Sequence, residues 1–449
     1  MRILFVVHGF PPYSVGGTEI YTYNLAKELN KSHEVYIFYR RADPSQEEYT
    51  VSNELFKGLQ LTAINNTFRN IVDFSMTYKN EVIARKFSTF IDEIKPDIVH
   101  FQHLTCLSTS LISVCHNKGI PTVFTLHDYW MVCQRGQLLQ PDLSLCSGPE
   151  DAKCAKCMAT QIRSLSPAMT HNKAGATLEQ HSALYNRVTA KIKQALAHFL
   201  KKRSQAQWAV MVMRRRTKHI WAMLNQIDLF IAPSRFHRNQ FIRFGVPPDK
   251  ILFLDNGINL RLFENFKKTP SEILRFGFIG SIIPSKGVHV LVEAFNGIDP
   301  DRAMLCIWGP DLPYDGYENY GQELRSMAAN PSIHFMGDFD NINVARVLAE
   351  IDVLIVPSIW YENSPLTIHE AFAAKIPVIA SNLGGMAEYV RHLKNGLLFE
   401  PRNSADLRAK INTLINNPGL IEAFSKNIGP VKTIEENARE LEEVYRQLL

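Results

Sequence analysis

The chain alternates short apolar runs with stretches of helical periodicity. Residues 2–7 form the first run, and residues 35–39 and 122–126 form later runs of the same kind. Runs that are apolar on both faces are typical of strands buried in a parallel sheet. Between the first two runs, Tyr21 and Leu25 fall on one face of a predicted helix. Strands that alternate with helices predict doubly wound α/β domains, whose ligands lie at the carboxyl ends of the strands.

The same alternation starts again in the second half of the chain. Strands are predicted there at residues 275–280, 304–308, 333–336, 353–356 and 378–380. A length of 449 residues suits two or three domains of about 150 residues each. We therefore expect two α/β domains, at residues 1–265 and 272–430. A terminal amphipathic helix is predicted at residues 431–449.

One loop in the second half carries two carboxylates beside a predicted helix start. Glu362 lies in the loop, and Glu370 follows eight residues later inside the helix. Ser364 is the predicted N-cap and Pro365 the predicted first helical residue. A helix start presents unpaired N–H groups and a partial positive charge, here around Ser364 and Leu366. This segment is therefore predicted to receive an anion or a sugar hydroxyl.

A glycine pair follows the first predicted strand. Gly16 and Gly17 come just before Thr18, the predicted N-cap of the first helix. Glycines at such a turn let backbone N–H groups approach a phosphate, although many strand-to-helix turns use glycine for geometry alone.

Three histidines fall at the carboxyl ends of predicted strands and so near the expected cleft. They are His100, His103 and His127, of which His127 comes directly after a strand. A hydrogen-bonded structural imidazole explains His100 and His103 equally well. Asp128 is interpreted either as a group that orients His127 or as the start of a turn.

The order of these patterns resembles the retaining glycosyltransferases of family 4, which have the GT-B fold of two Rossmann-like domains facing across a cleft. The resemblance covers the chain except for residues 45–90 and 158–225. It implies that Glu362 holds the donor sugar, that Glu370 binds the ribose, and that His127 contacts the donor sugar. The residues that it assigns to donor binding are Gly16, Gly17, Gly280, Ser281, Lys286, Gly337, Asn363, Ser364, Leu366 and Glu370. It also implies that the terminal helix returns to pack on the first domain.

The resemblance implies sugar transfer, with retention, from a UDP- or GDP-sugar to a glycan or lipid-linked acceptor in polysaccharide or glycolipid synthesis. His127, Lys286 and Glu362 are the implied catalytic residues, and Lys286 would stabilise charge on the departing diphosphate. The family usually has Arg where this chain has Ser281, so one of two expected phosphate cations is missing. No catalytic divalent metal is expected, because we find no Asp-x-Asp sequence suited to bridging a diphosphate and a metal. A nucleotide-sugar epimerase, a glycan phosphorylase and a catalytically weak, membrane-associated nucleotide-sugar-binding protein are the alternatives.

Four cysteines cluster within residues 133–157. They are Cys133, Cys146, Cys154 and Cys157. The final Cys-x2-Cys can present two thiolates to one metal, and the other two thiols could complete a tetrahedral site. A structural zinc ion is predicted, with an iron–sulfur cluster and unligated thiols as the alternatives.

Charge adds a possible membrane contact and argues against nucleic acid as a partner. The formal net charge of +5 is small for this length, and the basic residues gather in one predicted helical insertion at residues 161–225. A basic helix with interleaved aromatic residues is typical of a peripheral membrane contact, here through residues 191–221, although a solvated helix packed on the sheet is the alternative. No apolar run is long enough for a membrane span, and the first apolar run ends at His8, too early for a signal peptide. We therefore expect a cytoplasmic protein and include the inner face of the membrane as a candidate location for it.

Overall fold

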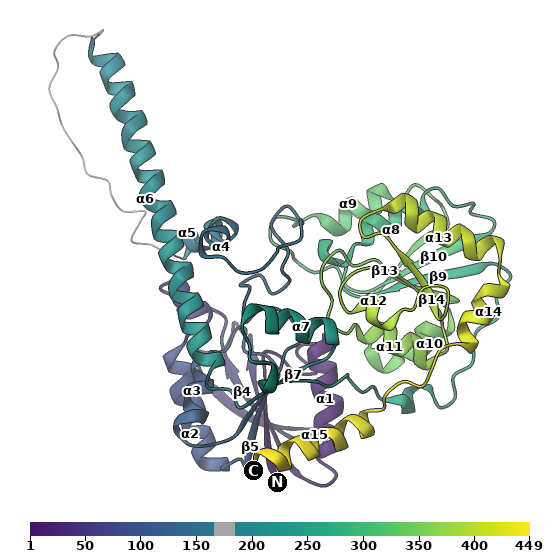
Figure 1. Cartoon of the computed structure of the whole chain (residues 1–449), viewed down its shortest axis with the longest axis horizontal. Helices are drawn as coiled ribbons and strands as arrows, with labels where there is room; N and C mark the ends of the chain where they lie inside the picture. Colours follow the sequence, from purple (N-terminus) through teal and green to yellow (C-terminus); the bar gives the residue numbers. More distant parts are fainter. Residues whose placement is uncertain (166–184) are drawn as a thin grey trace.

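The computed structural model describes residues 1–165 and 185–449 and shows two α/β domains joined through a hinge region (Figure 1). The middle of the predicted insertion at residues 161–225 lies outside these described residues. Within them, the first domain contains a sheet in the order β3-β4-β2-β1-β5-β6-β7-β8. Its strands are β1 (Arg2–Val7), β2 (Glu34–Arg41), β3 (Val51–Phe56), β4 (Leu59–Asn65), β5 (Ile98–Phe101), β6 (Thr122–Thr125), β7 (Leu229–Ala232) and β8 (Ile251–Phe253).

Apolar side chains on both faces of this sheet create two cores. Phe38 of β2 joins the core on one face of the sheet, whereas its neighbours Ile37 and Tyr39 join the core on the other face. This alternation follows from the two-residue period of a strand. The helices of the first domain are α1 (Gly17–Leu29), α2 (Glu81–Ile94), α3 (Ser110–Asn117), α4 (Asp151–Cys157), α5 (Ala159–Ser164), α6 (Tyr185–Leu224) and α7 (Arg235–Phe244).

The hairpin of β3 and β4 was not predicted from the sequence. The two strands run antiparallel, whereas β4 pairs in parallel with β2. Lys57 and Gly58 connect them, and both have positive φ, at 49° and 86°. Two such residues form the hairpin turn whose twist matches that of the flanking strands. The Lys-Gly pair between two alternating segments was therefore the overlooked signal.

The second domain has a parallel sheet in the order β11-β10-β9-β12-β13-β14. Its strands are β9 (Leu274–Ile279), β10 (Ala303–Trp308), β11 (Ile333–Gly337), β12 (Val353–Val356), β13 (Val378–Ser381) and β14 (Gly396–Phe399). Its helices are α8 (Val288–Phe295), α9 (Tyr320–Met327), α10 (Val344–Ala349), α11 (Leu366–Ala373), α12 (Met386–Tyr389), α13 (Ser404–Asn416) and α14 (Gly419–Lys426). The strand order reverses between β9 and β12, and in the first domain between β1 and β5. Such reversals open a crevice at the carboxyl ends of the strands, so the sequence-derived fold class is confirmed in its essentials.

The last helix, α15 (Ile434–Leu448), crosses back from the second domain and packs on α1 of the first (Figure 1). Thr433 and Glu436 form a capping box at its start. Its Tyr445 hydroxyl lies 2.6 Å from His100 Nδ1, and the other ring nitrogen of His100 lies 2.7 Å from Thr125 Oγ1. His100 is fully buried. His100 is therefore a hydrogen-bonded core residue, which is the second of the two interpretations given for it from the sequence.

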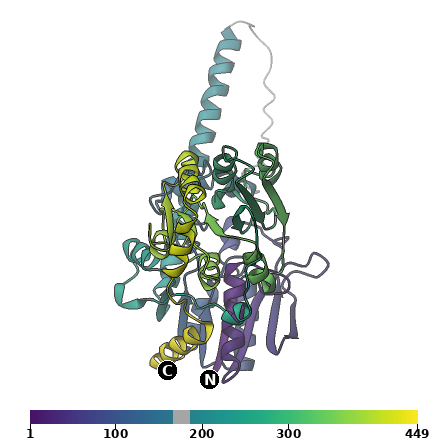
Figure 2. The same cartoon turned by 90° about the vertical axis from the view of Figure 1, so that its right-hand side faces the viewer.

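The helix α6 extends well beyond the body of the first domain, as both views show (Figures 1 and 2). Its carboxyl half packs against α3 and α4. In the part of the chain that the structure describes, no helix is at once long and apolar enough to cross a membrane.

Candidate functional site

The carboxyl ends of the two sheets meet at an interdomain cleft. Gly17 begins α1 on the first-domain side, and Leu366 begins α11 on the other side. A Cβ atom on Gly17 would lie 3.9 Å from Leu366 Cδ1, so the two helix starts face each other directly. The N-cap of α1 is Gly16 in extended conformation, not Thr18 as predicted. Thr18 instead lies within the helix, where its carbonyl accepts a hydrogen bond from Thr22 Oγ1.

Glu362 is the most strongly hydrogen-bonded of the predicted catalytic residues. Its Oε1 atom accepts from Lys286 Nζ at 2.6 Å, from Ser358 Oγ at 2.8 Å and from Trp360 Nε1 at 2.9 Å. The Glu362 side chain is buried, whereas that of Lys286 is 29% exposed. A buried carboxylate needs both a counter-charge and hydrogen bonds, and this cluster supplies them. Lys286 is therefore the partly exposed member of an ion pair whose carboxylate is buried.

A glycine brings Lys286 to this position. Lys286 ends a short 3₁₀ turn, Pro284–Lys286, and Gly287 follows with a φ of 70°. A Cβ atom on Gly287 would lie 2.0 Å from the carbonyl oxygen of Pro357, just after β12. The turn can approach the end of β12 this closely only because Gly287 has no side chain.

The start of α11 differs from the prediction. The helix begins at Leu366 with Pro365 as its N-cap, so neither Ser364 as cap nor Pro365 as first helical residue is correct. The Ser364 hydroxyl lies 2.8 Å from His369 Nε2 and donates to Asp255 Oδ1 at 3.3 Å, across the domain interface. Because it is engaged there, it does not cap the helix. The amide of Leu366 still lies at the helix start, facing the cleft.

Asn363 connects the second domain to the predicted active-site histidine. Its Nδ2 atom donates to the carbonyl oxygen of His127. The imidazole of His127 donates from Nε2 to Gln102 Oε1 at 2.7 Å. Burial lowers the pKa of His127 well below its ordinary value, and His103 lowers it further. His127 is therefore a neutral imidazole at the cleft.

Glu370 lies in the second turn of α11 and is 8% exposed. Burial raises the pKa of this carboxyl to about 7, and a hydrogen bond from Asn341 opposes the shift. The group is thus close to half ionised near neutral pH. Hydroxyl donors from a ligand would favour its ionised form.

The remaining predicted donor residues lie at the ends of β9 and β11. Ser281 follows Gly280, which comes directly after β9 and has a φ of 153°. A Cβ atom on Gly309 would lie 1.9 Å from the Gly280 carbonyl oxygen, and the Gly309 amide donates to the Gly337 carbonyl at 2.8 Å. The three glycines therefore form one continuous backbone surface along the edge of the sheet. Gly337 is exposed on it.

The four thiols of the cysteine cluster lie beside the first core. Cys133, Cys146, Cys154 and Cys157 are all free and pack, half-buried, against the first core. Within residues 1–165 and 185–449, no three His, Cys, Asp or Glu side chains are placed to hold one metal ion. Burial raises the pKa of Cys157 to about 11, and the thiols of Cys133, Cys154 and Cys146 raise it further, so the four thiols lie near one another. The structural zinc ion stays a prediction, with an iron–sulfur cluster and unligated thiols as the alternatives.

Several residues of the interface were missed from the sequence. Asp255 Oδ1 accepts from Tyr389 OH at 2.7 Å, and the Glu388 carboxylate accepts from the amides of Arg235 and Phe236 at 3.1 and 3.0 Å. These contacts hold the start of α7 against the second domain. Polar residues at strand ends and helix starts were the available signal, but their partners lie more than 130 positions away in the sequence.

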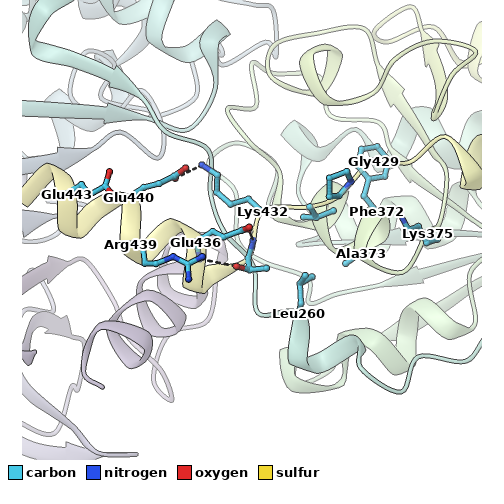
Figure 3. A pocket seen from close by; sticks show the side chains of 13 residues that line it. Leu260, Phe372, Ala373, Lys375, Gly429, Lys432, Glu436, Arg439, Glu440 and Glu443 are labelled. Atoms are coloured by element: carbon cyan, nitrogen blue, oxygen red, sulfur yellow. Dashed lines mark hydrogen bonds and ion pairs between the residues drawn. The ribbon is translucent and has the colours of Figure 1, made fainter. Parts of the chain in front are cut away.

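A separate cavity of about 770 Å³ lies on the hinge side of α11 (Figure 3). Lys375, just after the end of α11, lines it together with Lys432 and Glu440, which form an ion pair at 2.6 Å. The eight residues of α11 put about 12 Å between this end of the helix and its start at the cleft. Among the described residues, its lining includes none of the predicted site residues.

Two family models match the chain. Residues 15–147 match Glycosyltransferase Family 4, and residues 263–429 match Glycosyl transferases group 1. The first segment contains the Gly16–Gly17 turn and His127, and the second contains Lys286 and both carboxylates of the α11 region.

Curated relatives are similar over part of their length. An uncharacterized glycosyltransferase of Methanocaldococcus jannaschii is 30% identical over 220 residues, which are 45% of this chain and 60% of that protein. The alpha-maltose-1-phosphate synthase of Mycolicibacterium smegmatis is 26% identical over 247 residues, which are 49% of this chain and 63% of that protein. The matches thus span less than two thirds of either relative.

Solved structures are similar over the whole chain. HepE of Anabaena, in complex with UDP and glucose, has a TM-score of 0.66 at 17% identity and covers 100% of both chains. Sucrose-phosphate synthase of Thermosynechococcus elongatus has a TM-score of 0.66 at 18% identity and covers 100% of this chain and 99% of that one. At these identities the likeness establishes the two-domain fold.

Proposed function

Because its two matched segments are glycosyltransferase domains on a GT-B fold, we propose that this protein transfers a sugar, with retention, from a nucleotide-sugar donor to an acceptor hydroxyl. The Lys286–Glu362 pair is the observation that carries the proposal. It places a cation 2.6 Å from a buried carboxylate, beside a helix start that faces the glycine turn of the other domain. The diphosphate of a donor binds to a cation and to free amides, and the hydroxyls of its sugar donate hydrogen bonds to a carboxylate.

In the proposed complex the second domain holds the donor. The Leu366 amide and Lys286 bind the diphosphate, Glu362 accepts hydrogen bonds from the sugar, and Glu370 accepts from the ribose. The exposed backbone at Gly337 binds the base. HepE, which has the same fold, has been solved in complex with UDP-glucose, and this supports UDP as the nucleotide.

The proposed reaction occurs on one face of the donor sugar. The bond between the anomeric carbon and the phosphate oxygen breaks, and the acceptor oxygen bonds to that carbon from the same side. The acceptor proton passes to the departing phosphate, so no separate base is needed. Lys286 stabilises the charge on the leaving diphosphate. His127 is neutral and, with its backbone held by Asn363, contacts a hydroxyl of the transferred sugar.

The acceptor is proposed to be a glycan or a lipid-linked sugar, with a peripheral membrane contact of the first domain. An apolar groove of about 320 Å³ lies between α6 and the α4–α5 pair, lined by Ile162, Trp208 and several alanines. Lys156 and Arg163 are exposed on its rim. An apolar groove with a basic rim suits an acyl chain and an anionic headgroup. The side chains of residues 191–203 in the predicted contact lie outside those that the structure describes.

The test is a survey of donors followed by product analysis. Melting curves with UDP, GDP and their hexose conjugates identify the nucleotide, because a ligand that binds the folded state raises Tm. The selected sugar is then supplied, and NMR of the product reports the anomeric configuration. Retention supports the proposal, whereas inversion or the absence of any nucleotide-dependent shift would refute it. An epimer or a sugar phosphate as the product would favour the alternative enzymes.

Vesicle flotation tests the membrane contact separately. We expect the protein to float with vesicles that contain anionic lipid and to remain behind with neutral ones. A variant with Arg215→Glu and Lys218→Glu, both exposed on α6, should lose this binding and keep its UDP-induced shift in Tm. Equal flotation with neutral vesicles would contradict an electrostatic contact.

A further inference from the structure

The first domain carries a fixed but unpaired arginine at the cleft edge of its sheet. Arg40 lies near the end of β2. The register pairs Val7 of β1 with Tyr39 of β2, so His8 and Arg40 come next on the two strands. Because β2, β1, β5 and β6 are neighbouring parallel strands, their carboxyl ends lie along one edge, and His127 stands at the other end of this row.

A buried residue holds the head of Arg40 in place. Its Nε atom donates to the carbonyl oxygen of Asn66 at 2.7 Å, and Asn66 Nδ2 donates to the Cys106 carbonyl at 2.8 Å. Asn66 is 1% exposed. The Arg40 guanidinium carbon also lies 5.9 Å from the ring centroid of Phe68. The orientation of the guanidinium is therefore set by two loops, whereas its two terminal nitrogens take no part in these bonds.

The neighbouring arginine, Arg41, has a carboxylate partner, whereas Arg40 has none among the described residues. Arg41 lies 3.6 Å from Asp43, and its guanidinium carbon lies 4.1 Å from the ring centroid of Tyr13. Within residues 1–165 and 185–449, no carboxylate lies within ion-pair distance of Arg40. A half-buried guanidinium without a counter-charge is costly unless a ligand supplies one.

The nearby carboxylates are already engaged with other groups. Glu19 Oε1 accepts from Ser14 Oγ at 2.7 Å and lies 3.4 Å from His8 Nε2. Asp128 Oδ1 accepts from the Trp130 amide at 2.7 Å and lies 3.2 Å from His103 Nε2.

Two histidines, His8 and His103, lie between Arg40 and His127. The Thr105 amide donates to His103 Nδ1 at 3.1 Å, so the proton of His103 is on Nε2, toward Asp128. The His8 and His103 rings contact each other in a tilted arrangement with centroids 4.5 Å apart, and His8 Nδ1 is buried without a hydrogen-bond partner among the described residues. Burial lowers the pKa of His8 to about 4, and Arg40 is among the smaller causes. His8 Nδ1 is therefore the ring nitrogen of this pair that can still hydrogen-bond a sugar hydroxyl.

We propose that Arg40 binds a phosphate group of the acceptor, so that the acceptor is a phosphorylated sugar whose hydroxyls lie along His8 and His103. The inference rests on the proposed function and specifies its second substrate. Three strand spacings separate the ends of β2 and β6, about 14 Å at ~4.8 Å per spacing. A sugar that carries a phosphate or a diphosphate fills the distance between Arg40 and a donor sugar at His127. A guanidinium whose two terminal nitrogens take no part in the bond to Asn66 can bind a phosphate through them.

The first experiment measures anion binding with the donor site filled. Calorimetry follows pyrophosphate binding to the whole protein in saturating UDP, so that the donor phosphate site is occupied. Arg40→Ala should weaken this binding about tenfold or more, Arg40→Lys should restore part of it, and Arg41→Ala should leave it unchanged. Unchanged binding in Arg40→Ala, or an equal loss in Arg41→Ala, would overturn the inference. The UDP-induced shift in Tm must persist in each variant, and its absence in the wild type would instead refute the proposed donor site.

The second experiment identifies the source of the phosphate. Transfer from the selected donor is compared for soluble hexose 1-phosphates, for polyprenyl diphosphate sugars in detergent, and for unphosphorylated alkyl glycosides. Activity with either phosphorylated class that falls in Arg40→Ala through a raised KM supports the site and names its source. Wild-type use of the neutral glycoside as efficient as use of either phosphorylated class, or an unchanged KM for the phosphorylated acceptors in Arg40→Ala, would contradict it.

Discussion

The buried carboxyl of Glu370 gives the second domain a pH-dependent stability that can be measured. Burial raises its pKa to about 7 from an ordinary value of 4.5. The folded state therefore holds this proton more tightly than the unfolded state does. Stability is greatest below the unfolded pKa, falls as the pH rises through the window from about 4.5 to 7, and is level above it. At 1.36 kcal/mol for each pH unit, the total loss is about 3 kcal/mol.

Glu370→Gln removes the ionisation while nearly keeping the shape of the side chain. Urea unfolding of the wild type and the variant, followed from pH 5 to pH 8, should give curves that diverge toward neutral pH, with the variant gaining relative stability. Glu422→Gln, an exposed change on α14 of the same domain, is the matched control and should follow the wild type. Parallel profiles for Glu370→Gln and wild type between pH 5 and 7 would show that this carboxyl titrates normally.

The same titration should appear in donor binding with the opposite direction. A ribose donates its hydroxyl protons to an ionised carboxylate, so UDP affinity should rise as the pH passes through about 7. In Glu370→Gln, UDP affinity should be weaker and nearly independent of pH in this range. A wild-type affinity that is flat from pH 6 to 8 would be inconsistent with Glu370 as the ribose ligand.

Three further substitutions test the geometry of the cleft. Lys286→Ala should reduce turnover about 100-fold in a steady-state assay, because it removes the charge that stabilises the leaving diphosphate. Lys426→Ala on α14 is the control and should keep the wild-type rate. A wild-type rate in Lys286→Ala would exclude the charge-stabilising role. Gly287→Ala should lower both Tm and activity, because its Cβ would meet a backbone oxygen at 2.0 Å, whereas Gly419→Ala meets open space and should keep both. Asn363→Ala removes a hydrogen bond between the domains, so small-angle scattering should show a more open molecule; an unchanged radius of gyration would contradict this.

The parts of the site that sequence reasoning found are local in the chain. Gly16 and Gly17 lie in one turn, and Glu362 and Glu370 lie around one helix start, so spacing alone placed them together. The fold followed for the same reason, because alternating strands and helices form parallel sheets with few possible connections.

The parts that were missed depend on contacts between distant segments. Ser364 has the sequence signature of an N-cap, yet its hydroxyl bonds Asp255 of the other domain, and tertiary structure overrides the local preference. Gln102 and Trp360 bond predicted catalytic residues, but neither side chain is distinctive in the sequence. Cys154 and Cys157 have metal-like spacing, and the structure packs both, partly buried, against the first core.

The return of α15 to the first domain has a consequence for the order of synthesis. Ile434, Ala438, Leu441 and Tyr445 belong to the core that also contains β1 and α1. While the ribosome is still translating the second domain, that apolar face of the first domain has no cover. The earliest segment to emerge therefore completes its core with one of the latest, and a nascent chain stalled before α15 should bind chaperones through the face of α1.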